Sequence, residues 1–188
     1  MRIISGKFRG RKLVDSKNLK SLRPTTDMAR EALFNILVSS KKLREIFKAQ
    51  DVNILDICCG SGAVAFEALS RFAKTATLID SNRAHLEVAK KNAEILGVAS
   101  QAKILQLDAK KLPLNKEFFD LVFIDPPYEE DYFTIIQNLV EKGWIQKKSL
   151  VVIEHDKTSD LENIAQFLEE VDSRNYGKTS FSFLQLRN

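Results

Sequence analysis

A short stretch at residues 123–130, FIDPPYEE, ends an apolar run with an acid, two prolines and an aromatic ring. Proline has no backbone N–H and keeps the residue before it extended, so a sheet ladder cannot continue through Pro126 and Pro127. Asp125 and the fixed carbonyl of Pro126 could accept both hydrogens of a planar amine, while Tyr128 stacks on the base that carries it. The alternative is a strand that simply stops at a surface turn.

Three other apolar segments end in groups that suit a nucleoside. Residues 60–65 read GSGAVA, and glycines between a strand and a helix let the backbone approach a ligand closely. Asp80 ends the second segment, 20 residues after Gly60, at a distance typical of an acid that accepts both hydroxyls of a ribose. Asp108 ends the third segment and could accept a hydrogen bond from an adenine amine. These groups suit the adenosine of either NAD or S-adenosylmethionine.

The proline segment separates the two cofactors. A dinucleotide site needs room for nicotinamide beside the first helix, whereas residues 125–128 fill that position with rigid acceptors and a ring. We therefore predict S-adenosylmethionine as the cofactor and an exocyclic amine as the methyl acceptor. The sulfonium is already an activated electrophile, so the protein mainly aligns the amine, and positioning can lower a barrier by about 7–11 kcal/mol. Asp125 would also stabilise the positive charge that grows on nitrogen.

Alternating strands and helices must hold these segment ends together. Continuous apolar strands that alternate with helices are typical of a parallel sheet covered on both faces, and such sheets bind ligands at the carboxyl ends of their strands. We therefore predict an α/β, doubly wound, mostly parallel sheet that closes with an antiparallel hairpin over residues 169–186. The predicted strands are 53–57, 76–80, 102–108, 120–125 and 149–154, and the predicted helices are 26–37, 41–48, 63–72 and 83–97.

Length and composition limit the class of protein. The 188 residues are 44% hydrophobic and 29% charged, which is typical of a globular chain. No apolar stretch is long enough to cross a bilayer, and the basic start is not followed by the apolar segment of a secretory signal. The adjacent Cys58 and Cys59, with His85 and His155, have no zinc-ligand spacing. We expect a reduced, cytoplasmic protein with no metal site and no disulfide.

Basic residues are concentrated at the N-terminus. Residues 1–23 hold eight basic groups and one acid, a charge of +7, so the rest of the +4 chain sums to −3. The segment is either a solvated face or, as we predict, an RNA-binding arm whose cations surround Phe8 and whose glycines form a turn. The predicted division is this arm, 1–23, and a catalytic domain, 24–188. The candidate RNA contacts are Arg2, Lys7, Arg9, Arg11, Lys12 and Arg23.

Five motifs together resemble those of RsmD, the family of bacterial small-subunit ribosomal RNA guanine-N2 methyltransferases. They are MRIISGKFRGRKL, LRPTTDMAREALFNIL, LDICCGSGAVAFEALSR, TLIDSN and VFIDPPY, in the order and spacing of that family. The likeness extends through KGWI and the closing FSFLQL to almost the full length of the chain. The resemblance implies a Rossmann-like class I methyltransferase with a basic RNA-binding element at its N-terminus.

The resemblance also implies roles for individual residues, as contacts of the cofactor or of the target base. The cofactor contacts, from the methionine half to the adenine, are Asp56, Gly60, Gly62, Asp80, Asp108 and Ala109, with Thr26 and Arg30 alongside. The target guanine would be held by Asp125, Pro126, Pro127 and Tyr128. Cys58 and Cys59 depart from the family's loop, where phenylalanine or alanine is usual, and we interpret both as packing residues.

The resemblance implies a partner as well. This partner is 16S ribosomal RNA, free or within an assembling small subunit, and the enzyme is expected to act as a monomer away from membranes. The target guanine must leave its stack to reach the pocket. An adenine-N6 or protein-glutamine methyltransferase would use the same proline motif. An NAD-dependent oxidoreductase would share the glycine loop, and a non-enzymatic RNA-binding protein would explain the basic arm but not the ordered strand ends.

Overall fold

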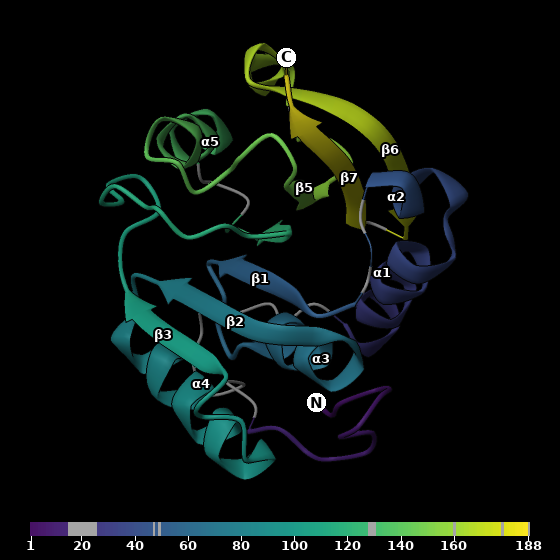
Figure 1. The fold of residues 1–188 in the computed structure, drawn as a ribbon, viewed down its shortest axis with the longest axis vertical. Coiled ribbons are helices and arrows are strands. Elements are labelled where there is room, and N and C mark those ends of the chain that lie inside the picture. Colours follow the sequence, from purple (N-terminus) through teal and green to yellow (C-terminus); the bar gives the residue numbers. More distant parts are fainter. Residues whose placement is uncertain are drawn as a thin grey trace.

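A seven-stranded sheet runs through the molecule in the order β3-β2-β1-β4-β5-β7-β6 (Figure 1). The computed structural model describes residues 1–14, 26–46, 48, 50–127, 131–159, 161–177 and 179–187. Strands β1 to β5 are parallel, and β7 is antiparallel to both β5 and β6. The strands are β1 (Val52–Ile57), β2 (Ala73–Asp80), β3 (Ala102–Gln106), β4 (Leu121–Ile124), β5 (Leu150–Asp156), β6 (Leu168–Tyr176) and β7 (Thr179–Leu186).

Helices connect the strands, and local capping fixes several of their ends. The Thr26 hydroxyl accepts a hydrogen bond from the Ala29 N–H at 3.1 Å, and Gly97 ends its helix in the left-handed conformation. The helices are α1 (Asp27–Ser39), α2 (Lys41–Ile46), α3 (Ala63–Arg71), α4 (Arg83–Leu96), α5 (Tyr132–Glu141) and the 3₁₀-helix η1 (Glu162–Gln166). Among the described residues, no helix has the length and apolar character needed to span a membrane.

Both faces of the sheet are buried, because neighbouring residues of a strand point to opposite faces. In β1, Ile54 belongs to a core shared with α1, α3 and α4, whereas Leu55 belongs to a second core shared with α5 and η1. Figure 1 shows α3 and α4 on one side of the sheet and α5 on the other. This arrangement is the doubly wound α/β fold that the alternation of the sequence predicts.

The predicted fold class and the closing antiparallel hairpin are confirmed. Helix α5 lies between the fourth and fifth predicted strands, in a stretch that was expected to be polar or helical and for which no helix bounds were predicted; its buried residues recur at helical spacing. Several strand boundaries also differ from the prediction, and two of these differences bear on the site. Strand β2 begins at Ala73, only two residues after α3 ends, and β3 ends at Gln106, before Asp108. The acid assigned to the end of the third strand therefore lies in the turn that follows.

Residues 1–14, here called the N-terminal strap, fold onto the domain. Arg2 and Lys12 form an antiparallel bridge. Ile3, Phe8 and Leu13 join the core shared with α1 and α3, and none of the three is more than 7% exposed. The burial of Phe8 corrects the expectation that its position among the cations serves contact with nucleic acid. The predicted boundary at residue 23 lies outside the described residues.

Candidate active site

The strand order reverses between β1 and β4, and the carboxyl ends of these strands border the crevice in which open α/β sheets bind ligands. Ile57 of β1 pairs with Ile79 of β2 and with Ile124 of β4. The next residues along these strands therefore lie at one level of the sheet, and they are Cys58, Asp80 and Asp125. The structure thus brings together three of the segments that the sequence singles out.

A tight turn, the glycine loop (residues 58–62), joins β1 to α3 at this level. Cys58, Gly60 and Gly62 have left-handed backbone conformations, with φ values of 61°, 53° and 77°. A Cβ at Gly62 would lie 2.5 Å from a ring carbon of Phe66 and 2.6 Å from a methyl carbon of Leu78, so only glycine fits. The loop therefore holds the N-terminus of α3, where the first backbone N–H groups have no partner within the helix, directly against the end of β1.

Asp80 organises this loop. One of its carboxylate oxygens accepts a hydrogen bond from the Gly60 N–H at 2.9 Å, and the other accepts one from the Asn82 N–H at 2.8 Å. The Nδ1 atom of His85 lies 3.2 Å from both oxygens, and Asp80 is 7% exposed. Three partners within the protein, Gly60, Asn82 and His85, therefore hold the carboxylate of Asp80. Its contact with a ribose stays a prediction.

Asp56 and Glu154 add two buried carboxylates near the strand ends. Asp56 is 2% exposed and accepts a hydrogen bond from the Ala65 N–H of α3 at 3.2 Å. Burial raises the pKa of Asp56 from 3.8 to about 7; the Ala65 N–H lowers this pKa, and the charges of Asp80 and Glu154 raise it. Glu154 is absent from the sequence-based prediction, although it follows the apolar run of β5 as Asp80 follows that of β2.

The proline segment directly follows β4. The Asp125 N–H donates to the Ile57 carbonyl at 3.3 Å, which places Asp125 beside the glycine loop. Asp125 is half-buried, Pro126 is buried and Pro127 is exposed. The parallel strand therefore ends at the acid, as the prolines predict. Tyr128 lies outside the described residues, and its stacking role stays a prediction.

The residues assigned to the adenine lie in the turn after β3. The Asp108 carboxylate accepts a hydrogen bond from the Lys110 N–H at 2.9 Å. Asp108 is exposed, whereas Ala109 is buried. The Leu107 N–H donates to the Asp80 carbonyl at 3.2 Å, so this turn lies beside the end of β2. The structure thus brings the two acids assigned to the adenosine onto neighbouring segments.

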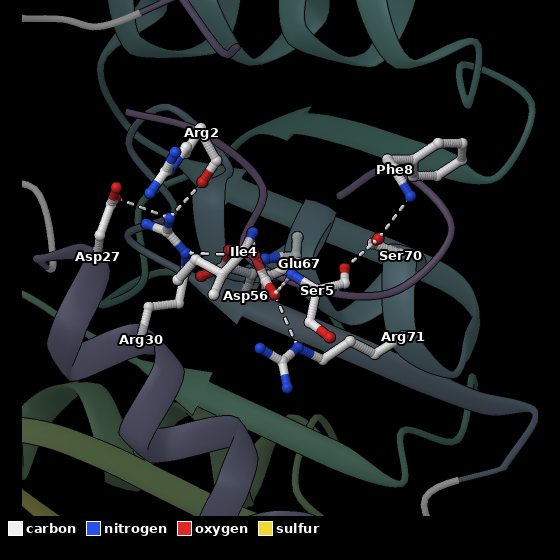
Figure 2. A network of polar contacts seen from close by, with 11 residues as sticks. Arg2, Ile4, Ser5, Phe8, Asp27, Arg30, Asp56, Glu67, Ser70 and Arg71 are labelled. Carbon is white, nitrogen blue, oxygen red and sulfur yellow. Dashed lines mark hydrogen bonds and ion pairs between the residues drawn. The ribbon is translucent and has the colours of Figure 1, made fainter. Parts of the chain in front are cut away.

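Arg30 lies in a buried polar network that joins α1, α3 and the N-terminal strap (Figure 2). Its Nη2 donates to the Arg2 carbonyl at 2.6 Å and to Asp27 at 3.0 Å, and its Nε lies 3.6 Å from a Glu67 carboxylate oxygen. Arg30 and Glu67 are fully buried, and the Nε and Nη1 of Arg30 have no hydrogen-bond partner in the part of the chain that the structure describes. A contact of Thr26 and Arg30 with the cofactor stays a prediction.

The candidate RNA contacts of the strap lie on its surface. Gly6 and Gly10 both have φ values of 82° and form the turn that the sequence predicts. The Arg11 guanidinium reaches α4, where it donates to the Ile95 carbonyl at 3.1 Å. Arg23 lies outside the described residues. The exposed cations of the strap are Arg2, Lys7, Arg9, Arg11 and Lys12.

The two cysteines have different environments. Cys59 is buried in one core, and burial raises the pKa of its thiol well above the ordinary value. Cys58 is half-buried and packs against the core on the opposite face. Within the ranges that the structure describes, no group of three or more His, Cys, Asp or Glu side chains could hold a metal ion.

Comparisons with known proteins agree with this fold. A family model described as conserved hypothetical protein 95 matches residues 1–185. Ribosomal RNA small subunit methyltransferase D of Haemophilus influenzae is 37% identical over 169 residues, covering 86% of this chain and 81% of that protein. The Escherichia coli protein of the same name is 36% identical over 166 residues, 87% of this chain and 79% of its own length. The solved structure of yhhF from Escherichia coli has a TM-score of 0.80 at 31% identity, covering 100% of this chain and 98% of that chain.

Proposed function

Since the chain belongs to the RsmD family, we propose that it methylates the exocyclic 2-amino group of a guanine in 16S ribosomal RNA. The chain has the class I methyltransferase fold, and the cofactor of this fold is S-adenosylmethionine. The observation that carries the proposal is the position of Asp125 and Pro126, which follow β4 at the reversal of strand order, directly beside the glycine loop.

The strand ends fit S-adenosylmethionine, whose sulfonium supplies an activated methyl group. The pKa of the buried Asp56 is raised to about 7, and a nearby positive charge would favour its ionised form. This cluster of acids therefore suits a cationic ligand. We infer that Asp56 and the glycine loop hold the methionine half, that Asp80 holds the ribose, and that Asp108 with Ala109 holds the adenine.

Asp125 orients the methyl acceptor. Its carboxylate and the Pro126 carbonyl accept the two hydrogens of the guanine amine, which turns the nitrogen lone pair toward the methyl group. Tyr128 stacks on the base after the base has left its helix. Asp125 also stabilises the positive charge that develops on nitrogen, where such stabilisation is worth about 10²–10³ in rate. The proton leaves after methyl transfer, so Asp125 need not be a strong base.

The exposed cations of the strap bind the RNA backbone in this proposal. Neutralised phosphates release counterions, so each contact contributes to affinity and to its salt dependence. Lys7 and Arg9 lie at the exposed turn of the strap and are the first candidates. The substrate is 16S ribosomal RNA, free or within an assembling small subunit, and the protein acts on it as a monomer in the cytoplasm.

Labelled methyl transfer identifies the product. Small-subunit ribosomal RNA from cells that lack the protein is incubated with the enzyme and labelled S-adenosylmethionine, and its nucleosides are then separated. We expect the label in N2-methylguanosine. Label in N6-methyladenosine, or in protein glutamine with none in RNA, would refute the guanine assignment.

Asp125→Ala tests the site itself. The variant is expected to fold and to bind S-adenosylmethionine within about twofold of wild type, yet to lose at least about 100-fold in single-turnover transfer at saturating RNA. Asp125→Asn keeps a carbonyl acceptor but has no charge, so its single-turnover transfer rate should lie between those of wild type and Asp125→Ala. The matched control is Asp131→Asn, an exposed acid at the start of α5. Undiminished transfer by folded Asp125→Ala would remove Asp125 from the mechanism.

A further inference from the structure

One face of α3 binds the backbone of the N-terminal strap (Figure 2). The two carboxylate oxygens of Glu67 accept hydrogen bonds from the Ile4 N–H at 2.8 Å and from the Ser5 N–H at 3.0 Å. One turn further along, the Ser70 hydroxyl donates to the Ser5 carbonyl at 2.6 Å and accepts from the Phe8 N–H at 2.9 Å. The side chains of two helical residues thus fix four backbone groups of the strap.

Glu67 is also the charged residue at the contact between α3 and residues 4–8 of the strap, here called the seam. Its side chain is fully buried, and the Nε of Arg71 lies 2.7 Å from one of its oxygens. The Nε of Arg30 lies 3.6 Å from the other oxygen, and Arg30 binds the Arg2 carbonyl. A buried carboxylate is stable only when charges and hydrogen bonds satisfy it, and here the strap supplies two of the donors. Docking of the strap and burial of Glu67 therefore depend on each other.

Gly6 brings the strap into direct contact with the helix backbone. The Lys7 N–H donates to the Ser70 carbonyl at 2.7 Å. At Gly6, where φ is 82°, an added Cβ would lie 2.0 Å from the Ser70 carbonyl oxygen, so no other residue fits this path. Together with Glu67, these contacts hold residues 4–8 in a single shape over α3.

This shape determines where the strap displays its cations. The turn from Gly6 to Gly10 presents Lys7 and Arg9 to solvent, while Phe8 between them is buried. The Nζ of Lys7 lies 5.3 Å from the centre of the Phe8 ring, and the guanidinium carbon of Arg11 lies 5.7 Å from it. The same ring thus anchors the turn in the core and restrains two of its charges.

We propose that Glu67 and Ser70 are positioning residues for the RNA substrate. They touch neither the cofactor nor the RNA; they hold the strap so that Lys7 and Arg9 meet the phosphates in a fixed register relative to the strand ends where methyl transfer occurs. The proposal rests on the proposed function, because it assumes that the strap binds ribosomal RNA. It makes the affinity for RNA depend on two side chains of α3, Glu67 and Ser70, that do not contact the RNA.

Three variants perturb the seam independently, and each is measured with the full chain. Glu67→Gln removes the buried charge, Ser70→Ala removes two hydrogen bonds without changing charge, and Gly6→Ala blocks the close approach. The probe is transcribed 16S ribosomal RNA, and the measurements are its affinity at several salt concentrations, its KM and kcat, and calorimetric affinity for S-adenosylmethionine. Glu87→Gln is the matched control, because Glu87 is an exposed acid that pairs with Lys90 on α4.

We expect Ser70→Ala and Gly6→Ala to fold, to bind S-adenosylmethionine within about twofold of wild type, and to keep kcat at saturating RNA. Their KM for RNA should rise at least about fivefold. The slope of log affinity against log salt should become shallower by about 1–2, as expected when two phosphate contacts are lost. Glu67→Gln should show the same pattern or a stronger one, and Glu87→Gln should behave as wild type.

Two results would overturn the proposal, and they differ from the result that would overturn RNA binding by the strap. Unchanged RNA affinity and salt slope in folded Ser70→Ala and Gly6→Ala would show that the seam does not position the cations. Equal losses of cofactor affinity, kcat and thermal stability would show that it only stabilises the fold. If the double variant Lys7→Ala, Arg9→Ala binds RNA with unchanged affinity, these two cations of the strap do not contact the RNA.

Discussion

Replacing Asp56 by asparagine is expected to stabilise the protein at pH 8 more than at pH 5. Asp56 is a residue of β1 that is 2% exposed and binds the backbone of α3, and burial raises its pKa from 3.8 to about 7. Asparagine has nearly the shape of the neutral acid, and its carbonyl can still accept the hydrogen bond from the Ala65 N–H. The substitution therefore removes the cost of ionising a buried group and leaves the packing almost unchanged.

The sign and size follow from proton linkage. A carboxyl whose folded-state pKa is raised contributes stability that is fully present below about pH 4 and is lost as the pH rises through about 7. Between pH 5 and pH 8 the folded protein must lose a proton from Asp56 that the unfolded chain has already largely lost. The free energy of unfolding of wild type should therefore fall by about 2–3 kcal/mol relative to Asp56→Asn over this range.

Urea denaturation of both proteins at pH 5, 6, 7 and 8, without cofactor, measures the difference. Comparing the proteins at each pH isolates the contribution of position 56, including its interaction with the charges of Asp80 and Glu154. The control is Asp131→Asn, since a hydrogen bond from the Thr134 hydroxyl lowers the pKa of Asp131, so its effect belongs below pH 4. A difference between wild type and Asp56→Asn that stays constant from pH 5 to pH 8 would refute the reasoning.

Three other predictions concern the glycine loop and Asp80, which binds it. Asp80→Ala should weaken S-adenosylmethionine binding by about 1.5–3 kcal/mol in calorimetry. Unchanged affinity in a folded variant would refute the assignment of Asp80 to the ribose. Gly62→Ala should lower the free energy of unfolding by more than about 1 kcal/mol, because its Cβ would overlap Phe66 and Leu78; an unchanged denaturation midpoint would contradict this. Cys58→Gly should raise that free energy by about 1 kcal/mol, because glycine adopts the left-handed conformation of Cys58 without strain; a lowered denaturation midpoint would contradict this.

Much of the sheet could be predicted because the apolar pattern of each strand agrees with the way in which the strands pair. Apolar runs that end at the glycine loop or in an acid identified β1, β2 and β4, and the parallel register then placed Asp80 and Asp125 at one level. The bounds of helix α5 were not predicted, although Tyr132, Ile135 and Leu139 recur at helical spacing, so the signal was present. The early start of β2 had no such signal, because Ala73 and the polar residues after it favour a strand only through pairing with β1.

The constraints on the site residues could not be predicted from local pattern. Asp80 reads as an acid at a strand end, but the Gly60 N–H and His85 that bind it depend on how the loop and α4 pack. Glu67 reads as an exposed helical charge, yet it is fully buried because the strap, more than 60 residues earlier in the chain, covers it. The charge of the strap also gives no sign that Phe8, which lies between Lys7 and Arg9, is buried.

The distance along the chain between the strap and its partners has a consequence for synthesis. Arg11 precedes the Ile95 carbonyl that it contacts by 84 residues. At about 5–20 residues per second, the ribosome needs about 4–17 s to extend the chain over that interval. Until α3 and α4 exist, Ile3 and Phe8 have no core to enter, and the cations beside them are free. The segment that we propose to bind ribosomal RNA therefore spends its first seconds undocked, next to the ribosome that makes it, and it can close onto α3 only after the chain has been extended past Arg71.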